Sequence, residues 1–295
     1  MRCKASILFV LLLFRYYSQS VPVIANNECA TELPQNYAQW RLGGGTIQNL
    51  VTTLKHSACL NKKFSVIFYV VLDSTGLWGA GLTPSVLNTC ITNLNNAFAP
   101  ICVSFQQCTV ITIPNFNFNK WRNDSTEIYV KQNFYSDKTI NIYLAENIIY
   151  TPPPSPPPIV LAGYTYMPPV GALEDLIVIK KSEILNTAPI HEMGHFFGLP
   201  HTFEEIGPAV IPPHPPNMLS YEFVARTNCY TNGDGFCDTE ADCYPLPNGT
   251  QDGNNKFYLR PTDNFMSYYS SSCRFTQEQY NFMAATIVSQ RLYLH

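Results

Sequence analysis

Short runs of apolar residues separated by polar turns dominate the chain before residue 200. Residues 64–73 (FSVIFYVVLD) are rich in β-branched and aromatic side chains, which predicts a buried strand. Residues 102–113, 139–145, 163–167 and 176–180 have the same character and predict further strands. Some of the segments between these strands contain helix-capping residues and apolar residues at helical spacing. The pattern therefore predicts the α/β class, with a twisted mixed sheet.

The first predicted helix opens at Thr83–Pro84, with threonine as N-cap and proline at the first helical position. Its apolar stripe is formed by Val86, Leu87, Cys90, Ile91, Leu94 and Phe98. A second helix is predicted from near Thr187, with Pro189 in its first turn, to near Gly198.

The last predicted element is a helix that begins at Thr276, where Thr276 and Gln279 have the spacing of a capping box. Its predicted core-facing residues are Phe282, Met283, Ile287 and Val288. Regular patterns are scarce between residue 201 and this helix, and Gly, Pro, Asn, Asp and Cys are frequent there. The sequence thus predicts one domain over residues 60–295, with a regular upper lobe (60–198) and an irregular, disulfide-stapled lower lobe (199–295).

Composition excludes several classes of protein. The chain is 46% hydrophobic and 13% charged with a net charge of −3, which is typical of a globular protein and argues against nucleic acid as a partner. Arg2 and Lys4 precede an apolar run of ten residues (5–14), so residues 1–20 are predicted to be a secretory signal. Residues 21–59 would be an N-terminal extension or a short pro-segment. No later run is long enough to span a membrane. We therefore expect a secreted, extracellular protein. The sequence leaves its oligomeric state open.

The number of cysteines is typical of a protein that forms disulfides in an oxidising compartment. Ten are present, and Cys3 would leave with the signal. The remaining nine are Cys29, Cys59, Cys90, Cys102, Cys108, Cys229, Cys237, Cys243 and Cys273. Because this number is odd, at least one thiol is free, pairs between chains or has a chemical role.

One string carries most of the chemical information. Residues 191–201 (HEMGHFFGLPH) contain His191, Glu192, His195, Gly198 and His201 in the order H-E-x-x-H-x-x-G-x-x-H. On a helix, histidines four residues apart share one face and reach one ion. A turn at the glycine would return the third histidine as a ligand. Three protein ligands leave a position for water, as in a catalytic zinc site.

The adjacent Glu192 points away from the two helical histidines, so it would act as general base towards that water during peptide hydrolysis. Two rival interpretations belong to other classes. The chain is either a catalytically silent zinc-binding protein, which would lack the base or a ligand, or a structural secreted module in which the string is incidental. All ligands and the base are present, and metal analysis would separate the last interpretation from the others.

The extended string resembles that of the metzincin metallopeptidases. The chain is most similar to their pappalysin (ulilysin-like) branch in three segments: residues 191–203 (HEMGHFFGLPHTF), 232–239 (NGDGFCDT) and 263–268 (DNFMSY). The resemblance covers roughly residues 60–290. It implies a two-lobe metzincin-type catalytic domain with two long helices above the cleft, a zinc cofactor and a protein or peptide substrate.

It also implies roles for single residues. Met266 would form the methionine turn beneath the three histidines, and Tyr268 would lie near the metal and stabilise the oxyanion. The edge strand at residues 163–167 would pair with an extended substrate. Asp234, Asp238, Thr239 and Asp242 form an oxygen-rich loop, where the resemblance implies calcium.

The resemblance further implies disulfides between Cys229 and Cys243 and between Cys237 and Cys273, although sequence alone allows three connectivities. Two roles are open for Cys29. As in some metzincins, it would ligate the zinc from a pro-segment and keep the enzyme latent, or it would join a disulfide within the first 110 residues. Because no known latency motif surrounds Cys29, the disulfide is the favoured interpretation.

Overall fold

The structure is a computed structural model that describes residues 29, 31, 59–122, 125–150, 159–168, 175–204, 221–244, 246–269 and 271–294. The predicted signal (1–20) and most of the predicted extension (21–59) lie outside the described residues. Within them, no helix has both the length and the hydropathy needed to cross a bilayer.

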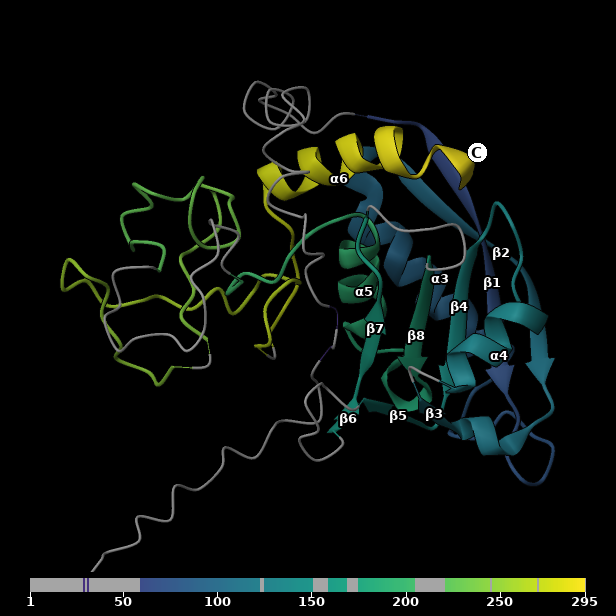
Figure 1. The fold of residues 1–295 in the computed structure, drawn as a ribbon. Helices are drawn as coiled ribbons and strands as arrows, with labels where there is room; N and C mark the ends of the chain where they lie inside the picture. The colour runs from purple at the N-terminus through teal and green to yellow at the C-terminus, as the bar shows by residue number, and fades with distance from the viewer. Residues whose placement is uncertain are drawn as a thin grey trace, which may run out of the picture.

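A five-stranded sheet forms the upper lobe, in the order β2-β1-β4-β8-β7 (Figure 1). Its strands are β1 (Lys62–Val71), β2 (Val103–Ile113), β4 (Ile140–Ala145), β7 (Gly163–Thr165) and β8 (Leu176–Lys180). The first four strands of this order are parallel, and β7 runs antiparallel to β8 at the edge. Each of these strands overlaps one of the segments predicted from sequence, although β1 begins two residues earlier than predicted, and the mixed sheet is confirmed.

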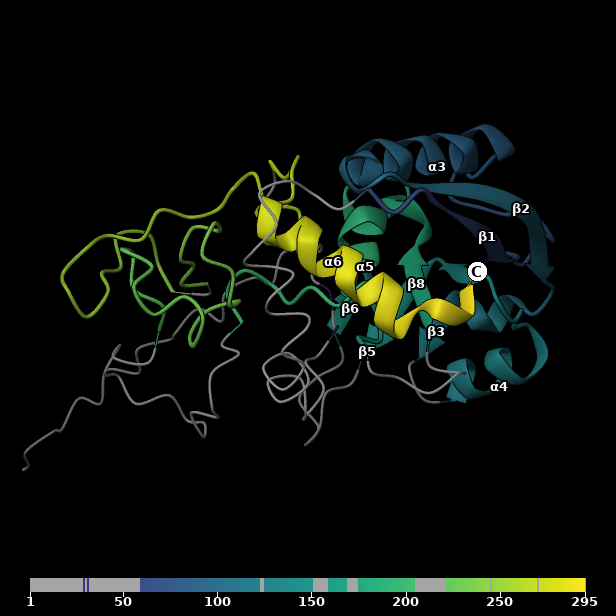
Figure 2. The same cartoon turned by 90° about the horizontal axis from the view of Figure 1, so that it is seen from above.

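Helices α3 (Pro84–Phe98) and α5 (Ala188–Phe196) cover one face of the sheet, and α6 (Gln277–Gln290) lies across the top of the fold in Figure 1 and joins the same core (Figures 1 and 2). Alternate residues of β1 divide between the two faces. Phe64, Val66, Phe68 and Val70 join the core beneath these helices, while Ile67, Tyr69 and Val71 face the other side. Both faces are therefore buried, which explains why β1 reads as a continuous apolar run.

The opposite face is covered by α4 (Ser125–Asn133) and by a small sheet of β3 (Lys120–Arg122), β5 (Asn147–Tyr150) and β6 (Ile159–Leu161). The buried Trp121 lies in the second core with the side chains of this layer. These elements were not predicted, because α4 carries no apolar stripe and the strands are only three or four residues long. Short 3-10 turns occupy Ala99–Ile101, Phe116–Asn119, Lys181–Glu183 and Leu292–Leu294.

The predicted helix starts are confirmed. The hydroxyl of Thr83 accepts a hydrogen bond from the Val86 amide at 3.2 Å. Thr276 and Gln279 form both bonds of the capping box. One predicted core residue is wrong, because Val288 is 41% exposed. Val288 follows the fully buried Ile287 and lies on the exposed side of α6.

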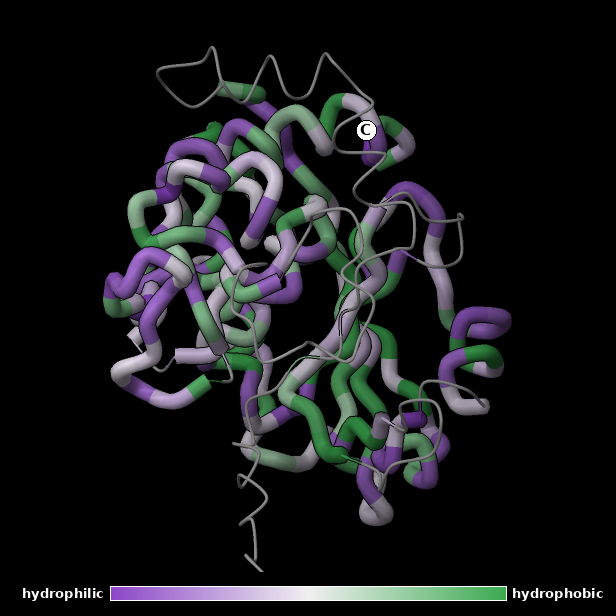
Figure 3. Tube along the Cα trace, turned by 60° about the vertical axis from the view of Figure 1, so that its left-hand side comes forward, coloured by the Kyte–Doolittle hydropathy of each residue, from purple (hydrophilic) through white to green (hydrophobic). Residues whose placement is uncertain are grey.

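The lower lobe consists mainly of turns and loops, seen in green to yellow at the left of Figure 1, before the chain enters α6. Hydrophobic colour follows the strands of the upper lobe in Figure 3, while the loop region is mixed and largely hydrophilic. A small cluster of Ala241, Cys243 and Tyr258 forms a local core there. This lobe therefore depends on hydrogen bonds and covalent links more than on apolar burial.

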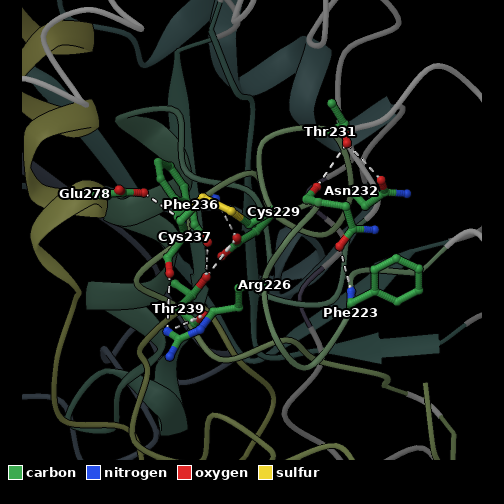
Figure 4. The surroundings of a disulfide bond; sticks show 11 residues. Phe223, Arg226, Cys229, Thr231, Asn232, Phe236, Cys237, Thr239 and Glu278 are labelled. Atoms are coloured by element: carbon green, nitrogen blue, oxygen red, sulfur yellow. Dashed lines mark hydrogen bonds between the residues drawn. A yellow bond between two sulfur atoms is a disulfide. The ribbon is translucent and has the colours of Figure 1, made fainter. Parts of the chain in front are cut away.

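The disulfides differ from the predicted pairs. Cys229 is joined to Cys237 (Figure 4). Cys243 and Cys273 are free thiols. The turn between the bonded cysteines contains Gly233 and Gly235, both at positive φ, and brings the two Cα atoms within 5.1 Å. Spacing along the chain carries no information about this local reversal. A second disulfide, Cys59–Cys102, links the segments that precede β1 and β2.

Candidate metal centre

Helix α5 and the turn after it bring the three predicted histidines together. His191 and His195 lie one helical turn apart, and Gly198 adopts a φ of 92°, which ends the helix and returns the chain towards it. The Nε2 atom of His195 lies 3.1 Å from that of His191 and 3.0 Å from that of His201. All three side chains are buried.

This arrangement fits a zinc ion. Zn–N bonds of about 2.0–2.1 Å in a tetrahedral site place ligand nitrogens roughly 3.3 Å apart. The observed separations are close to that value. Three imidazoles that converge without a cation would direct lone pairs or protons at one another in a buried space, which is unfavourable. The Sγ atom of Cys29 completes a group of four potential ligand atoms that all lie within 4.8 Å of one another.

The ring nitrogens that face away from this centre are also fixed. His191 Nδ1 lies 2.6 Å from the Phe265 carbonyl oxygen, and His195 Nδ1 lies 2.6 Å from the Leu199 carbonyl oxygen. These acceptors favour the tautomer that leaves Nε2 unprotonated and available to a metal. Burial lowers the pKa of His191 to about 3 and that of His195 well below its ordinary value, so both rings are neutral donors.

Met266 packs against α5 and the segment after His201. It is fully buried, and its carbonyl accepts a hydrogen bond from the Thr202 amide at 3.1 Å, next to His201. A Cβ atom on Gly194 would lie 2.5 Å from Met266 Sδ, so a larger residue at this position of α5 would require the methionine side chain to move. The sequence marked Met266 by resemblance, whereas Gly194 occupied a variable position of the string and was not singled out.

Glu192 lies beneath the edge strand β7. Its side chain is buried, and a Cβ atom on Gly163 would approach its Cγ to 3.0 Å. Burial raises the pKa of this carboxyl to about 8, against the opposing effect of hydrogen bonds from Cys29 and Thr31. A group with such a raised pKa beside a metal centre is suited to accept and return a proton near neutral pH.

The N-terminal segment enters this centre. Cys29 is a buried, free thiol whose Sγ donates to Glu192 Oε2 at 3.4 Å, so the favoured disulfide for Cys29 is wrong. Its backbone forms a parallel bridge with Gly163 of β7, and its carbonyl accepts a hydrogen bond from the Tyr268 hydroxyl at 2.7 Å. Sequence reasoning saw no local motif at Cys29, because the contacts that define its role are formed more than 130 residues away along the chain.

Thr31 adds contacts that the sequence did not reveal. Its hydroxyl lies 3.1 Å from Glu192 Oε2 and 3.2 Å from the Thr165 carbonyl oxygen, and it accepts a hydrogen bond from the Thr165 amide at 3.0 Å. Thr31 is 4% exposed. Together Cys29 and Thr31 contact Glu192, Tyr268 and the edge strand.

Tyr268 lies where the sequence predicted, close to two of the histidines. Its ring centroid is 4.8 Å from that of His201 and 6.0 Å from that of His191. A cavity of about 320 Å³ begins beside His191 and Glu192. The turn that precedes α5 and the segment from Ser267 to Tyr269 form its walls. The cavity is of a size to receive a side chain or a short part of a peptide.

The predicted calcium residues are only partly brought together. Asp234 and Thr239 are buried neighbours, and the Thr239 hydroxyl donates to Asp234 Oδ1 at 2.9 Å. Asp238 Oδ2 accepts a hydrogen bond from the Glu278 amide at the start of α6. The buried Glu222 carboxylate, which the sequence did not mark, lies against Gly233, where a Cβ atom would be 2.4 Å from Glu222 Oε2.

Asp242, the fourth predicted calcium residue, forms hydrogen bonds with residues next to the metal centre. It accepts hydrogen bonds from the Thr202 hydroxyl at 2.7 Å, from the Tyr269 hydroxyl at 2.9 Å and from the Tyr244 amide at 3.1 Å. It thus links the residue after His201 to the residue after Tyr268. Burial raises the pKa of Asp242, and these hydrogen bonds oppose the shift.

Comparison with known proteins gives a consistent result. No family model matches the chain. It is 26% identical over 229 residues to an extracellular metalloprotease of Sordaria macrospora, covering 71% of this chain and 68% of the relative. Extracellular metalloproteases of Neurospora crassa and Verticillium alfalfae are also 26% identical, with 71% of this chain covered in each case.

Solved structures agree on the fold. Promirolysin of Tannerella forsythia, solved as the mutant E225A, matches with a TM-score of 0.54 at 14% identity, covering 90% of this chain and 94% of its own. Mirolysin in complex with a small compound matches with a TM-score of 0.50 at 15% identity, covering 77% and 92%. The predicted two-lobe α/β fold is confirmed by these neighbours. The relatives named extracellular metalloproteases confirm the prediction that this chain is a metalloprotease.

Proposed function

We propose that the protein is a secreted zinc endopeptidase in which Glu192 is the general base. The observation that carries the proposal is the convergence of three buried histidines, with the Nε2 atom of His195 3.1 Å from that of His191 and 3.0 Å from that of His201, beside the buried carboxyl of Glu192 on the same helix. Zinc in this site would supply Lewis acidity towards a peptide carbonyl and would acidify a water molecule. Secretion is supported by the predicted signal and by the extracellular relatives.

The residues of the chain have distinct tasks in this proposal. Glu192 would accept a proton from the attacking water and pass it to the leaving amine. The Tyr268 hydroxyl, now bonded to the Cys29 carbonyl, would donate to the substrate carbonyl oxygen as it gains charge. Strand β7 would pair with an extended peptide, since its outer edge is the one that Cys29 and Thr31 occupy. The adjoining cavity would receive a substrate side chain.

The same contacts support a latent state. Cys29 brings a sulfur to the three histidines, and together with Thr31 it occupies the base, the tyrosine and the edge strand. A peptide cannot bind where these residues lie. The full chain would therefore be a zymogen, and displacement or cleavage of the N-terminal segment would free the centre.

Calcium is proposed for the lower lobe, around Asp234 and Thr239. Both residues are buried in a turn that offers carboxylate, hydroxyl and carbonyl oxygens, and the buried Oδ1 of the adjacent Asp238 makes no hydrogen bond within the described residues. Calcium would raise the melting temperature of the wild-type protein, and this shift would be lost in Asp234→Asn. An equal shift in both proteins would exclude this loop as the binding site.

The proposed activity is tested with a peptide library and the Glu192→Ala variant. The protein, activated by removal of the N-terminal segment, should cleave internal peptide bonds, and a chelator should abolish cleavage. Glu192→Ala should retain one zinc per chain and lose activity by at least about a hundredfold. A zinc-loaded wild-type protein without activity would instead favour a silent binding protein. Turnover retained in zinc-loaded Glu192→Ala would exclude Glu192 as the base.

A further inference from the structure

The three histidines differ in what holds the nitrogen that faces away from the centre. His191 and His195 use backbone carbonyls, at 2.6 Å in each case. His201 Nδ1 instead faces a side chain, with Glu204 Oε1 at 3.2 Å. His201 is therefore the one histidine of this centre whose outer contact depends on a charged and replaceable group.

Among the residues that the structure describes, Glu204 offers an acceptor to the Nδ1 atom of His201. The ring is 2% exposed, and its Nδ1 atom makes no hydrogen bond of standard geometry within the described residues. Phe203 stacks on the ring at 4.8 Å with an interplanar angle of 9°, which restricts rotation of the imidazole. A buried N–H needs an acceptor, and the Glu204 carboxylate is at ion-pair distance from it.

The backbone of the same turn holds Glu204 in place. The His201 amide donates to Glu204 Oε2 at 3.1 Å, and the Glu204 amide donates to the His201 carbonyl at 3.2 Å. The Glu204 side chain is 20% exposed, so its charge remains partly solvated. One carboxylate thus contacts both the backbone and the ring of the third ligand.

We propose that Glu204 is a positioning residue that orients His201 as a metal ligand through a carboxylate–imidazole pair. The inference rests on the proposed zinc site. A carboxylate acceptor at Nδ1 keeps the proton on that nitrogen and directs the lone pair of Nε2 towards the metal. His201 follows a turn rather than lying on the helix, so its ring lacks the support that α5 gives to the other two. The pair with Glu204 replaces that support.

The test is zinc affinity of the full-length chain, measured by competition with a chromophoric chelator, in Glu204→Ala and Glu204→Gln. Removal of an outer partner of a metal-bound histidine typically weakens metal binding by about 10–100-fold. Glu204→Ala should show a loss of this size. Glu204→Gln keeps an acceptor oxygen without the charge, so it should recover part of the affinity. Cobalt substitution should also give a changed visible absorption spectrum in Glu204→Ala, because the geometry at His201 would be altered.

Glu240→Gln is the matched control. It removes the same charge from an ion pair with Arg274 of 3.4 Å that contacts no histidine, so zinc affinity and the cobalt spectrum should match the wild type. Because Cys29 also lies at the centre, the comparison is repeated in Cys29→Ser. Thermal unfolding of the zinc-free variants shows whether they fold.

The outcomes separate the two proposals. If the wild-type chain binds no zinc, the proposed metal site itself fails. If the wild type binds zinc and folded Glu204→Ala binds it with unchanged affinity and an unchanged cobalt spectrum, the role of Glu204 is refuted while the zinc site stands. If Glu204→Ala does not fold, the test depends on Glu204→Gln. In that case, a zinc affinity and a cobalt spectrum of Glu204→Gln equal to those of Glu240→Gln would overturn the inference.

Discussion

The Thr31 hydroxyl offers a direct test of the proposed latent state. It contacts three polar atoms of the centre: Glu192 Oε2, the Thr165 carbonyl oxygen and the Thr165 amide. Thr31→Val removes these contacts and keeps the shape of the side chain. Thr31→Ser keeps a hydroxyl and serves as the matched control. Cys29 is unchanged in both variants, so the thiol stays available to the histidines.

The size of the effect follows from the hydrogen bonds. A buried bond between neutral groups contributes about 1 kcal/mol, and a buried group left unpaired costs roughly 1–3 kcal/mol. Loss of the Thr31 hydroxyl leaves the Thr165 amide without this partner and takes one donor from Glu192. A net weakening of about 2 kcal/mol corresponds to roughly 30-fold in the equilibrium between the closed and open segment, since about 1.4 kcal/mol is tenfold.

The assay is the initial rate of cleavage of a quenched fluorescent peptide by the unprocessed chain, with the integrity of the chain followed on gels. We expect Thr31→Val to show a basal rate about 30-fold above that of the wild type, and Thr31→Ser to stay close to the wild type. After the segment is removed, all three proteins should have the same kcat and KM, because Thr31 is then absent. A Thr31→Val chain as silent as the wild type would refute the reasoning, as would equal leakage in both variants.

Three further predictions follow from other buried groups. Asp242→Ala should destabilise the protein by about 2–3 kcal/mol in urea unfolding, because it leaves the Thr202 and Tyr269 hydroxyls unpaired, and the calcium-induced melting shift should survive. Arg291→Met should cost about 3 kcal/mol in the same assay, because the buried guanidinium donates twice to the Phe196 carbonyl at the end of α5. The pKa of His191 is lowered to about 3 by burial, whereas an unfolded histidine titrates near 6.5. Stability of the zinc-free protein should therefore be highest above about pH 6.5 and fall as the pH falls towards 3, with a flatter profile in His191→Gln.

The parts of the molecule that sequence predicted well are those set by local spacing. The two helical histidines share a face because they are four residues apart, and Gly198 adopts the positive φ that its residue type permits. The strands of the five-stranded sheet were identified because both faces of that sheet are buried. The capping box at Thr276 is likewise a property of four consecutive residues.

The parts that sequence did not predict depend on contacts between distant segments. Helix α4 has no apolar stripe, and its buried residues include Glu127, which bonds to Tyr164 and Tyr166 from β7 and the residue after it. Such a helix is specified by partners about forty residues away. The pairing of Cys229 with Cys237 depends in the same way on a turn with two glycines at positive φ, which spacing of cysteines does not encode.

Two glycines allow strand β7 and Met266 to pack closely against α5. A side chain on Gly194 would collide with Met266, and one on Gly163 would meet Glu192 and the Val178 carbonyl. Met266 and the strand above the base therefore approach α5 more closely than larger residues at these positions would allow without a shift. Because Gly163 is also the residue that pairs with Cys29, the edge strand holds the base from one side and receives the N-terminal segment at the same point. In the proposed mechanism, a peptide aligned along this strand would reach Glu192 and the three histidines, so it would compete with the N-terminal segment for one set of contacts.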